Sequence, residues 1–159
     1  MRILGNGIAR LICCTVCIAV APYAHADWSM LQGTAGGSGC AVETASITMH
    51  DGYQDTRIKL NINDQRLLVI TESYIDNGFG DIGLQVDGSA TIPADAVADE
   101  QNVLFTSNIP AIVEQFRKGS SASVHLRFWP SYPATQRYSA RFSLMGFTRA
   151  WKAYLQCRG

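Results

Sequence analysis

The chain has 159 residues, and its 13 basic and 13 acidic side chains cancel to a formal charge of zero at pH 7. Because no basic excess is available to neutralise phosphates, the composition argues against a nucleic-acid-binding protein. A single domain of this size can bury a hydrophobic core without the help of a metal ion.

The first 26 residues have the pattern of a secretory signal peptide. Arg2 and Arg10 supply a basic start, residues 11–21 are apolar, and Ala24 and Ala26 place small side chains where a signal peptidase cuts. The apolar stretch is too short to cross a bilayer, which takes roughly 20 residues. We therefore predict a signal peptide and a periplasmic or secreted protein.

Cleavage near Ala26 would leave residues 27–159 as a single β-rich domain. Removing 26 of the 159 residues, two arginines among them, leaves 133 residues with 11 basic and 13 acidic side chains, a formal charge of −2. No later apolar run approaches membrane length, so we do not expect this domain to span a membrane.

Cleavage would also change the cysteine count. Cys13, Cys14 and Cys17 lie in the signal, so only Cys40 and Cys157 would remain of the five cysteines. In an oxidising compartment such a pair is expected to form a disulfide. The absence of C-x-x-C spacing argues against a redox role, and we predict a structural bridge worth roughly 4–5 kcal/mol in the chain-entropy model.

After a glycine-rich stretch at 33–39, interpreted as a flexible loop, the chain shows a series of short strands. The clearest is 57–63, where apolar and polar side chains alternate, and residues 66–71 return from a turn as its hairpin partner. Further strands are predicted at 40–49 with a break near 44–46, at 82–87, at 91–93 as an edge, at 121–129 and at 138–144.

Two helices are predicted from apolar residues at helical spacing. The first covers residues 108–118, with Asn108 as its cap, Pro110 in its first turn and Gly119 as its stop. The second covers residues 147–156. Its apolar stripe, which we expect in the core, consists of Phe147, Ala150, Trp151 and Tyr154.

Helices and strands do not alternate regularly, which argues against a doubly wound parallel sheet. We predict a mainly β fold, a β-sandwich or a barrel-like arrangement of mostly antiparallel strands, with two short α-helices of which one is C-terminal. The first helix would close one end of the sheets, and the last would carry Cys157 to Cys40.

Several segments, taken in order, resemble a known family. They are DW at 27–28, CAV at 40–42, GDIGLQVD at 80–87, IVEQFRKG at 112–119 followed by VHL at 124–126, and FSLMGFTRA at 142–150. In this order they resemble the invasion-associated locus B family of bacterial secreted proteins. The resemblance implies a secreted β-rich domain with no assigned reaction, which in some members engages the host or the envelope. The chain departs from the family in having no cysteine pair in its middle.

The polar side chains give little support for catalysis. His50, Asp51 and Asp55 are of metal-ligand types, but one histidine among them is more typical of a polar turn. His125 is placed on the outer face of its strand beside Arg127, and no G-x-S-x-G turn offers a nucleophile.

An exposed acidic connection is predicted before the first helix, with Asp95, Asp99 and Glu100. No apolar setting is indicated there that would raise the pKa of one carboxyl group for general acid catalysis. We therefore expect no enzyme activity, no metal and no cofactor.

Aromatic side chains near residue 130 form the better candidate site. Trp129, Tyr132 and Arg127, with Tyr138 close by, are placed away from the core by strand alternation. These residue types are enriched where the binding energy of protein interfaces concentrates. The alternative is that Trp129 covers a sheet edge or packs under the last helix.

The favoured hypothesis is an exported, non-enzymatic protein that binds a protein of the envelope or outside the cell through Arg127, Trp129 and Tyr132. A second hypothesis is a periplasmic inhibitor or immunity protein of an extracytoplasmic hydrolase. A third is a hydrolase that uses His125 or the His50 loop.

Overall fold

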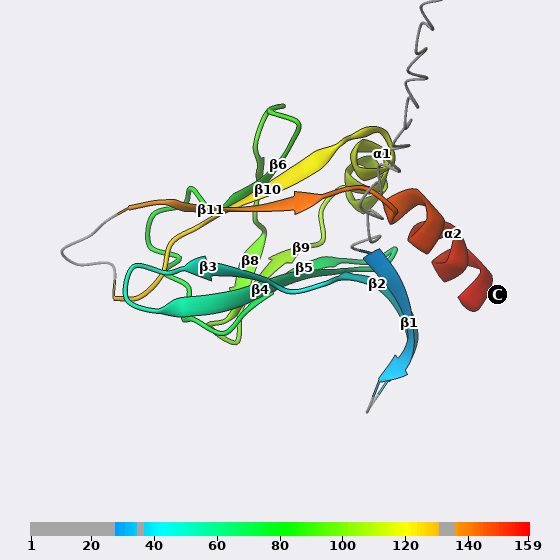
Figure 1. The fold of residues 1–159 in the computed structure, drawn as a ribbon, viewed down its shortest axis with the longest axis horizontal. Coiled ribbons are helices and arrows are strands. Elements are labelled where there is room, and N and C mark those ends of the chain that lie inside the picture. Colours follow the sequence, from blue (N-terminus) through cyan, green and yellow to red (C-terminus); the bar gives the residue numbers. More distant parts are fainter. Residues whose placement is uncertain (1–27, 35–36, 131–135) are drawn as a thin grey trace, which may run out of the picture.

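The computed structural model describes residues 28–34, 37–130 and 136–159. Two β-sheets lie face to face, and both helices lie at one end of them (Figure 1). Within these residues the sheets do not close into a barrel. The predicted mainly antiparallel, sandwich-like fold with two helices is therefore confirmed. The predicted signal peptide lies outside the described residues and stays a prediction.

The larger sheet has seven strands in the order β1-β2-β4-β5-β9-β8, with β3 paired to β4. All of these pairs are antiparallel, including the predicted β4–β5 hairpin. The break predicted near residues 44–46 separates β2 from β3. The strands are β1 (Trp28–Thr34), β2 (Gly37–Thr44), β3 (Ile47–His50), β4 (Asp55–Ile62), β5 (Leu67–Thr71), β8 (Ala96–Ala98) and β9 (Asn102–Phe105).

The smaller sheet has four antiparallel strands in the order β11-β10-β6-β7. The proline-containing β7 lies at its edge, as predicted. β10 ends at Leu126 rather than at Trp129, because the next residues leave the sheet and Phe128 forms an isolated bridge with Ile75. The strands are β6 (Gly83–Val86), β7 (Ile92–Pro93), β10 (Ser121–Leu126) and β11 (Tyr138–Ser143).

The core lies between the two sheets and is built from alternate positions along their strands. Ile58, Leu60 and Ile62 of β4 are fully buried, as are Leu84 of β6 and Val124 of β10. Burial of each such side chain stabilises the fold by roughly 1.5–3 kcal/mol. The alternation visible in the sequence therefore decides which face of each strand turns inward.

The two helices, α1 (Ile109–Lys118) and α2 (Phe147–Cys157), cover the same end of the sandwich (Figure 1). In the described part of the chain, no helix is long and apolar enough to cross a bilayer. The apolar stripe predicted for the C-terminal helix is confirmed. Its buried members are Phe147, Ala150, Trp151 and Tyr154.

A cluster of three aromatic rings joins the first strand to both helices. The indole ring of Trp28 lies 5.8 Å from the ring of Phe116 in α1 and 4.9 Å from that of Phe147 in α2. Its N–H donates a hydrogen bond to the carbonyl oxygen of Ser143 at 2.8 Å. Trp28 thus connects β1, both helices and the end of β11.

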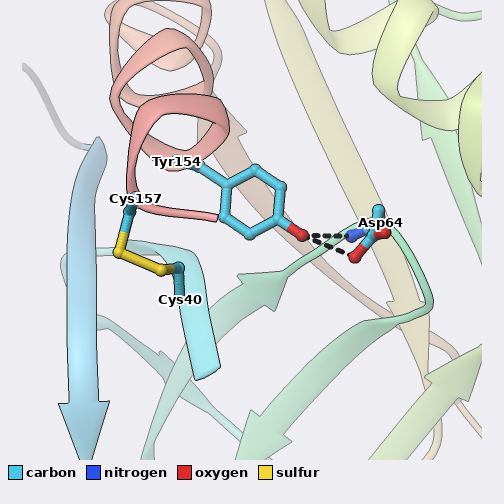
Figure 2. The surroundings of a disulfide bond; sticks show 4 residues. All are labelled: Cys40, Asp64, Tyr154 and Cys157. Atoms are coloured by element: carbon cyan, nitrogen blue, oxygen red, sulfur yellow. Dashed lines mark hydrogen bonds between the residues drawn. A yellow bond between two sulfur atoms is a disulfide. The ribbon is translucent and has the colours of Figure 1, made fainter. Parts of the chain in front are cut away.

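The predicted disulfide joins Cys40 of β2 to Cys157 at the end of α2, with the two Cα atoms 6.1 Å apart (Figure 2). Beside it, the hydroxyl of Tyr154 donates to Oδ1 of Asp64 at 2.5 Å and accepts the Asp64 backbone N–H at 3.1 Å. Burial raises the pKa of the Tyr154 phenol, and the bond to Asp64 raises it further. A covalent bond and a hydrogen-bonded pair therefore hold α2 against the larger sheet.

Strands occupy parts of two segments that were predicted as loops. Within the glycine-rich stretch, residues 33–34 belong to β1 and residues 37–39 to β2, with Gln32 paired to Cys40 and Thr34 to Gly37. The exposed acidic connection contains the β8–β9 hairpin, in which Ala98 pairs with Asn102. These strands were missed because glycines carry no side-chain pattern and strands of three or four residues are too short to show a period, whereas Asp95, Asp99 and Glu100 themselves are exposed and lie outside the strands, as predicted.

The start of α1 differs from the prediction, and its end agrees with it. Asn108 stands before the helix in the left-handed region, with φ 62°, and its side chain makes no capping hydrogen bond. Gly119 does end the helix, but in an extended conformation, with φ −83° and ψ 167°. A Cβ at Gly119 would lie 2.6 Å from Cγ1 of Val86 and 2.9 Å from the carbonyl oxygen of Gln115. Glycine is therefore needed for the close approach of the helix end to β6.

Candidate functional site

The described residues of the predicted site, Arg127 and Trp129, lie at the end of the sandwich away from the helices. β10 starts directly after α1, and β11 runs into α2, so the residues that follow β10 are carried to the opposite end (Figure 1). Arg127 and Trp129 belong to this segment, and Tyr132 lies outside the described residues. Arg127 and Trp129 therefore lie at the end of the sandwich where loops, and not helices, connect the strands.

The segment holding Trp129 pairs with the residues after β5. Ile75 and Phe128 form an antiparallel bridge, and the backbone N–H of Trp129 donates to the carbonyl oxygen of Tyr74 at 2.9 Å. Opposite residues of an antiparallel pair share a face. Ile75 and Phe128 are buried, so Tyr74 and Trp129 face outward together, with 56% and 55% of their surfaces exposed.

The turn between β8 and β9 supplies the third side of this site. The backbone N–H of Ile75 donates to the carbonyl oxygen of Glu100 at 2.7 Å, and the backbone N–H of Thr71 donates to the carbonyl oxygen of Gln101 at 3.0 Å. The Gln101 side-chain amide donates to the carbonyl oxygen of Glu72 at 2.7 Å. These bonds hold the tip of the hairpin beside Tyr74.

These three segments enclose a cavity of about 390 Å³, which we call the aromatic pocket. Among the described residues, its lining combines two exposed aromatic rings, apolar side chains, an amide and a carboxylate, with no basic side chain. The lining residues are Tyr74, Ile75, Asn77, Val97, Glu100 and Trp129. Of these, only Trp129 belonged to the predicted binding surface, and Glu100 was predicted only as part of the acidic connection. The others come from segments whose contact with residue 129 depends on the fold.

Arg127 stands next to the pocket but turns to other partners. Its guanidinium donates to both carboxylate oxygens of Asp81, at 2.8 and 2.7 Å, and lies 4.1 Å from the centre of the Phe79 ring. The hydrogen bond from Arg127 lowers the pKa of Asp81. The ion pair of Arg127 with Asp81 therefore fixes the loop that follows Tyr74. Phe79, in the same loop, has 45% of its surface exposed.

Tyr138 belongs to the core rather than to the exposed group. It is half-buried, and its ring centre lies 5.7 Å from that of Phe128. The alternative packing of Trp129, under the last helix, is contradicted because α2 lies at the other end of the sandwich.

His125 is buried, although the alternation of β10 directs it away from the core. Only 8% of its surface is exposed, and Nδ1 lies 2.8 Å from Oγ of Ser139 on the neighbouring strand. Burial lowers the pKa of the imidazole, and the nearby charge of Arg137 lowers it further. No carboxylate of the described residues is hydrogen-bonded to the ring. A histidine and a serine do meet here, but the burial of the ring leaves little access for a substrate.

The turn at His50 is held together by its own side chains. Oδ1 of Asp51 accepts the backbone N–H groups of Tyr53 and Gln54, each at 2.8 Å, and Oδ2 accepts the hydroxyl of Ser73 at 2.5 Å. Nδ1 of His50 accepts the backbone N–H of Gly52. Across the described residues, no group of three histidines, cysteines or carboxylates is placed to hold a metal ion.

The three carboxylates of the predicted acidic connection do not meet at one point. Asp95 precedes β8 and accepts the backbone N–H groups of Thr106 and Ser107, which lower its pKa to about 2. Asp99 and Glu100 follow β8, at the tip of the hairpin. Asp95 is therefore a structural carboxylate, whereas Glu100 lines the aromatic pocket.

No family model matches the chain. No curated protein and no solved structure matches it either. The resemblance to the invasion-associated locus B family therefore stays a prediction.

Proposed function

We propose that this chain is exported and acts as a non-enzymatic binding protein, whose aromatic pocket engages a protein of the envelope or outside the cell. One observation carries the proposal. Tyr74 and Trp129 are each more than half exposed, and a backbone pairing holds both on the same face at the edge of a cavity. Exposed aromatic rings beside a hollow are typical of the centre of a protein interface.

The rigidity of the site supports this proposal. Hydrogen bonds between main-chain groups join all three segments, and the buried Ile75 and Phe128 anchor two of them in the core. A tyrosine or tryptophan held in this way loses little conformational entropy when a partner covers it. The surface is thus prepared for binding before the partner arrives.

The features of the chain outside the pocket agree with an exported protein. The first 26 residues carry the signal pattern, and the bridge between Cys40 and Cys157 suits an oxidising compartment. The family that the chain resembles consists of secreted proteins that in some cases engage a host or an envelope. The proposed partner is therefore sought in those compartments.

The proposal predicts that removing one ring abolishes capture of a specific partner. The purified protein, immobilised, is exposed to envelope and extracellular fractions in parallel with Trp129→Ala and Tyr74→Ala variants, and the bound proteins are identified. The affinity of a purified partner is then measured by calorimetry. Because truncation of a central interface residue costs about 2 kcal/mol or more, we expect each variant to bind at least about thirtyfold more weakly.

Met145→Ala is the matched control for this experiment, because Met145 is 56% exposed but lies beside α2, at the other end of the sandwich. This variant should bind like the parent protein. Equal affinity of the parent, Trp129→Ala and Tyr74→Ala would refute the assignment of the surface.

A further inference from the structure

We infer that the aromatic pocket receives a basic side chain, arginine or lysine, presented by the partner protein. This inference rests on the proposed function and specifies the chemistry of the same site. It follows from three properties of the described residues, namely the two rings, the charge of the lining, and the apolar lining and size of the cavity.

The rings provide faces for a cation. Tyr74 and Trp129 project from opposite positions of one backbone pairing, and both remain largely exposed. Cations are attracted to the electron-rich faces of such rings, and tryptophan is the strongest of the three aromatic types. Arg127 already makes this contact with Phe79 in the neighbouring loop, at 4.1 Å.

The charge of the lining has the complementary sign. Glu100 is the one charged residue among the six that line the pocket, and it forms no ion pair with another described residue. Asp99 adds a second carboxylate next to it in the sequence. Arg127, two positions before Trp129 in the chain, is paired with Asp81. An incoming positive charge would therefore meet an unpaired negative one.

The conformation of the hairpin tip supports a special role for Glu100. Asp99 and Glu100 have φ of 51° and 56°, in the left-handed region where glycine is the default. Asparagine and aspartate tolerate this region better than glutamate does. Residues in this region occur both in tight hairpin turns and at binding sites, and Glu100 lines the pocket.

The apolar lining and the size of the cavity suit a single long side chain. Ile75 and Val97 add apolar residues to the lining, and Asn77 adds a polar amide. At about 390 Å³ the cavity is at the small end of ligand pockets. Lysine and arginine combine an apolar stem with a cationic end, so they match a lining that is partly apolar and partly polar.

The test compares two small probes that differ in charge and hardly in shape. The assigned indole N–H resonance of Trp129 is followed by NMR while the purified protein is titrated with Nα-acetyl-arginine amide or with Nα-acetyl-citrulline amide. We expect the arginine compound to shift this resonance with an affinity at least about fivefold higher than that of its neutral analogue. The Glu100→Gln substitution should lower the affinity for the arginine compound by about fivefold.

Glu114→Gln is the matched control, because Glu114 is an exposed carboxylate on α1, far from the pocket in the fold. It should leave the preference for arginine unchanged. Equal affinities of the two probes, or full affinity of Glu100→Gln for arginine, would overturn the inference. Binding of chitotriose at Trp129 without a response to arginine would also overturn it and would point to a saccharide site.

Failure of this inference can be told apart from failure of the proposed function. If capture of the partner is lost in Trp129→Ala but unchanged in Glu100→Gln, the basic side chain is refuted and the binding surface stands. The opposite result has two parts. If Trp129→Ala still captures the partner, while the arginine probe shifts the Trp129 indole resonance of the parent protein, the pocket binds a basic group but is not the protein-binding surface.

Discussion

At the scale of single residues, His125 shows how the surroundings of a side chain change its chemistry. The alternation of its strand correctly directs it away from the core, yet only 8% of its surface is exposed. The burial makes the charged form costly, so the pKa of the imidazole falls below its ordinary value of about 6.5. A neutral ring paired with Ser139 is therefore the stable form at neutral pH.

This burial predicts a loss of stability in mild acid. Between the lowered pKa of the folded state and the ordinary pKa, the unfolded chain binds more protons at residue 125, so the free energy of unfolding falls as the pH falls below about 6.5. The slope of the free energy of unfolding against pH is a fraction of about 1.4 kcal/mol per pH unit, the limit for one titrating group. Urea unfolding at pH 7.5 and pH 5 measures it, and His125→Gln should flatten the dependence.

His50→Gln is the matched control for this pH effect, because that imidazole is exposed. Carboxylates with lowered pKa values, such as Asp95 at about 2, lose their contribution to the free energy of unfolding only at lower pH, so they do not affect the comparison between pH 7.5 and pH 5. A pH dependence that persists unchanged in His125→Gln would show that another group causes it.

Gly119 shows how a correct residue-level prediction can have a cause that only the fold reveals. The sequence predicts that glycine ends the first helix, and it does. A glycine that ends a helix is commonly left-handed, whereas Gly119 is extended and lies so close to Val86 of β6 that a Cβ would not fit. That contact joins residues far apart in the chain, so no local pattern reveals it.

At the scale of elements, long strands and helices were predictable and short or glycine-rich ones were not. β4, β5, β11 and both helices carry enough alternating or helical positions to show their period. β1, β8 and β9 depend on partners for their strand conformation. Trp28 illustrates the difference, because its contacts with α1 and α2 involve residues about ninety or more positions away.

The Trp28 cluster predicts a large difference between two chemically identical substitutions. Trp28→Phe removes the indole hydrogen bond to Ser143 and leaves a gap among buried rings, so we expect it to lower the free energy of unfolding by about 2–3 kcal/mol. Trp129→Phe, at an exposed position, should change it by less than about 0.5 kcal/mol. Urea unfolding monitored by circular dichroism compares the two, and equal losses would contradict the role of Trp28 as an anchor.

At the scale of the whole molecule, the disulfide connects parts of the chain separated by 117 positions. It attaches the last helix to the second strand and so encloses nearly the whole described domain in one covalent loop (Figure 2). Such a loop restricts the unfolded chain far more than it changes the folded one. The stability of the domain should therefore depend on the redox state of its compartment.

We predict that the double variant Cys40→Ser, Cys157→Ser loses roughly 4–5 kcal/mol of unfolding free energy, the value expected for a loop of this length. Denaturant unfolding of the variant and of the parent protein under non-reducing conditions measures the difference. The control is the parent protein after reduction, which should approach the stability of the variant. Two free thiols in the non-reduced parent, detected by mass spectrometry, would contradict the bridge.

The sequence by itself determined the β-rich class, the faces of the longer strands, the two helices and the pairing of Cys40 with Cys157. These follow from local periodicity and from a count of two cysteines outside the signal-like segment. Only the tertiary structure decided that Trp129 stands beside Tyr74 and Glu100 over one cavity. The physical reason is that those residues come from three segments whose proximity depends on main-chain hydrogen bonds between non-local partners, and such bonds leave no trace in side-chain spacing.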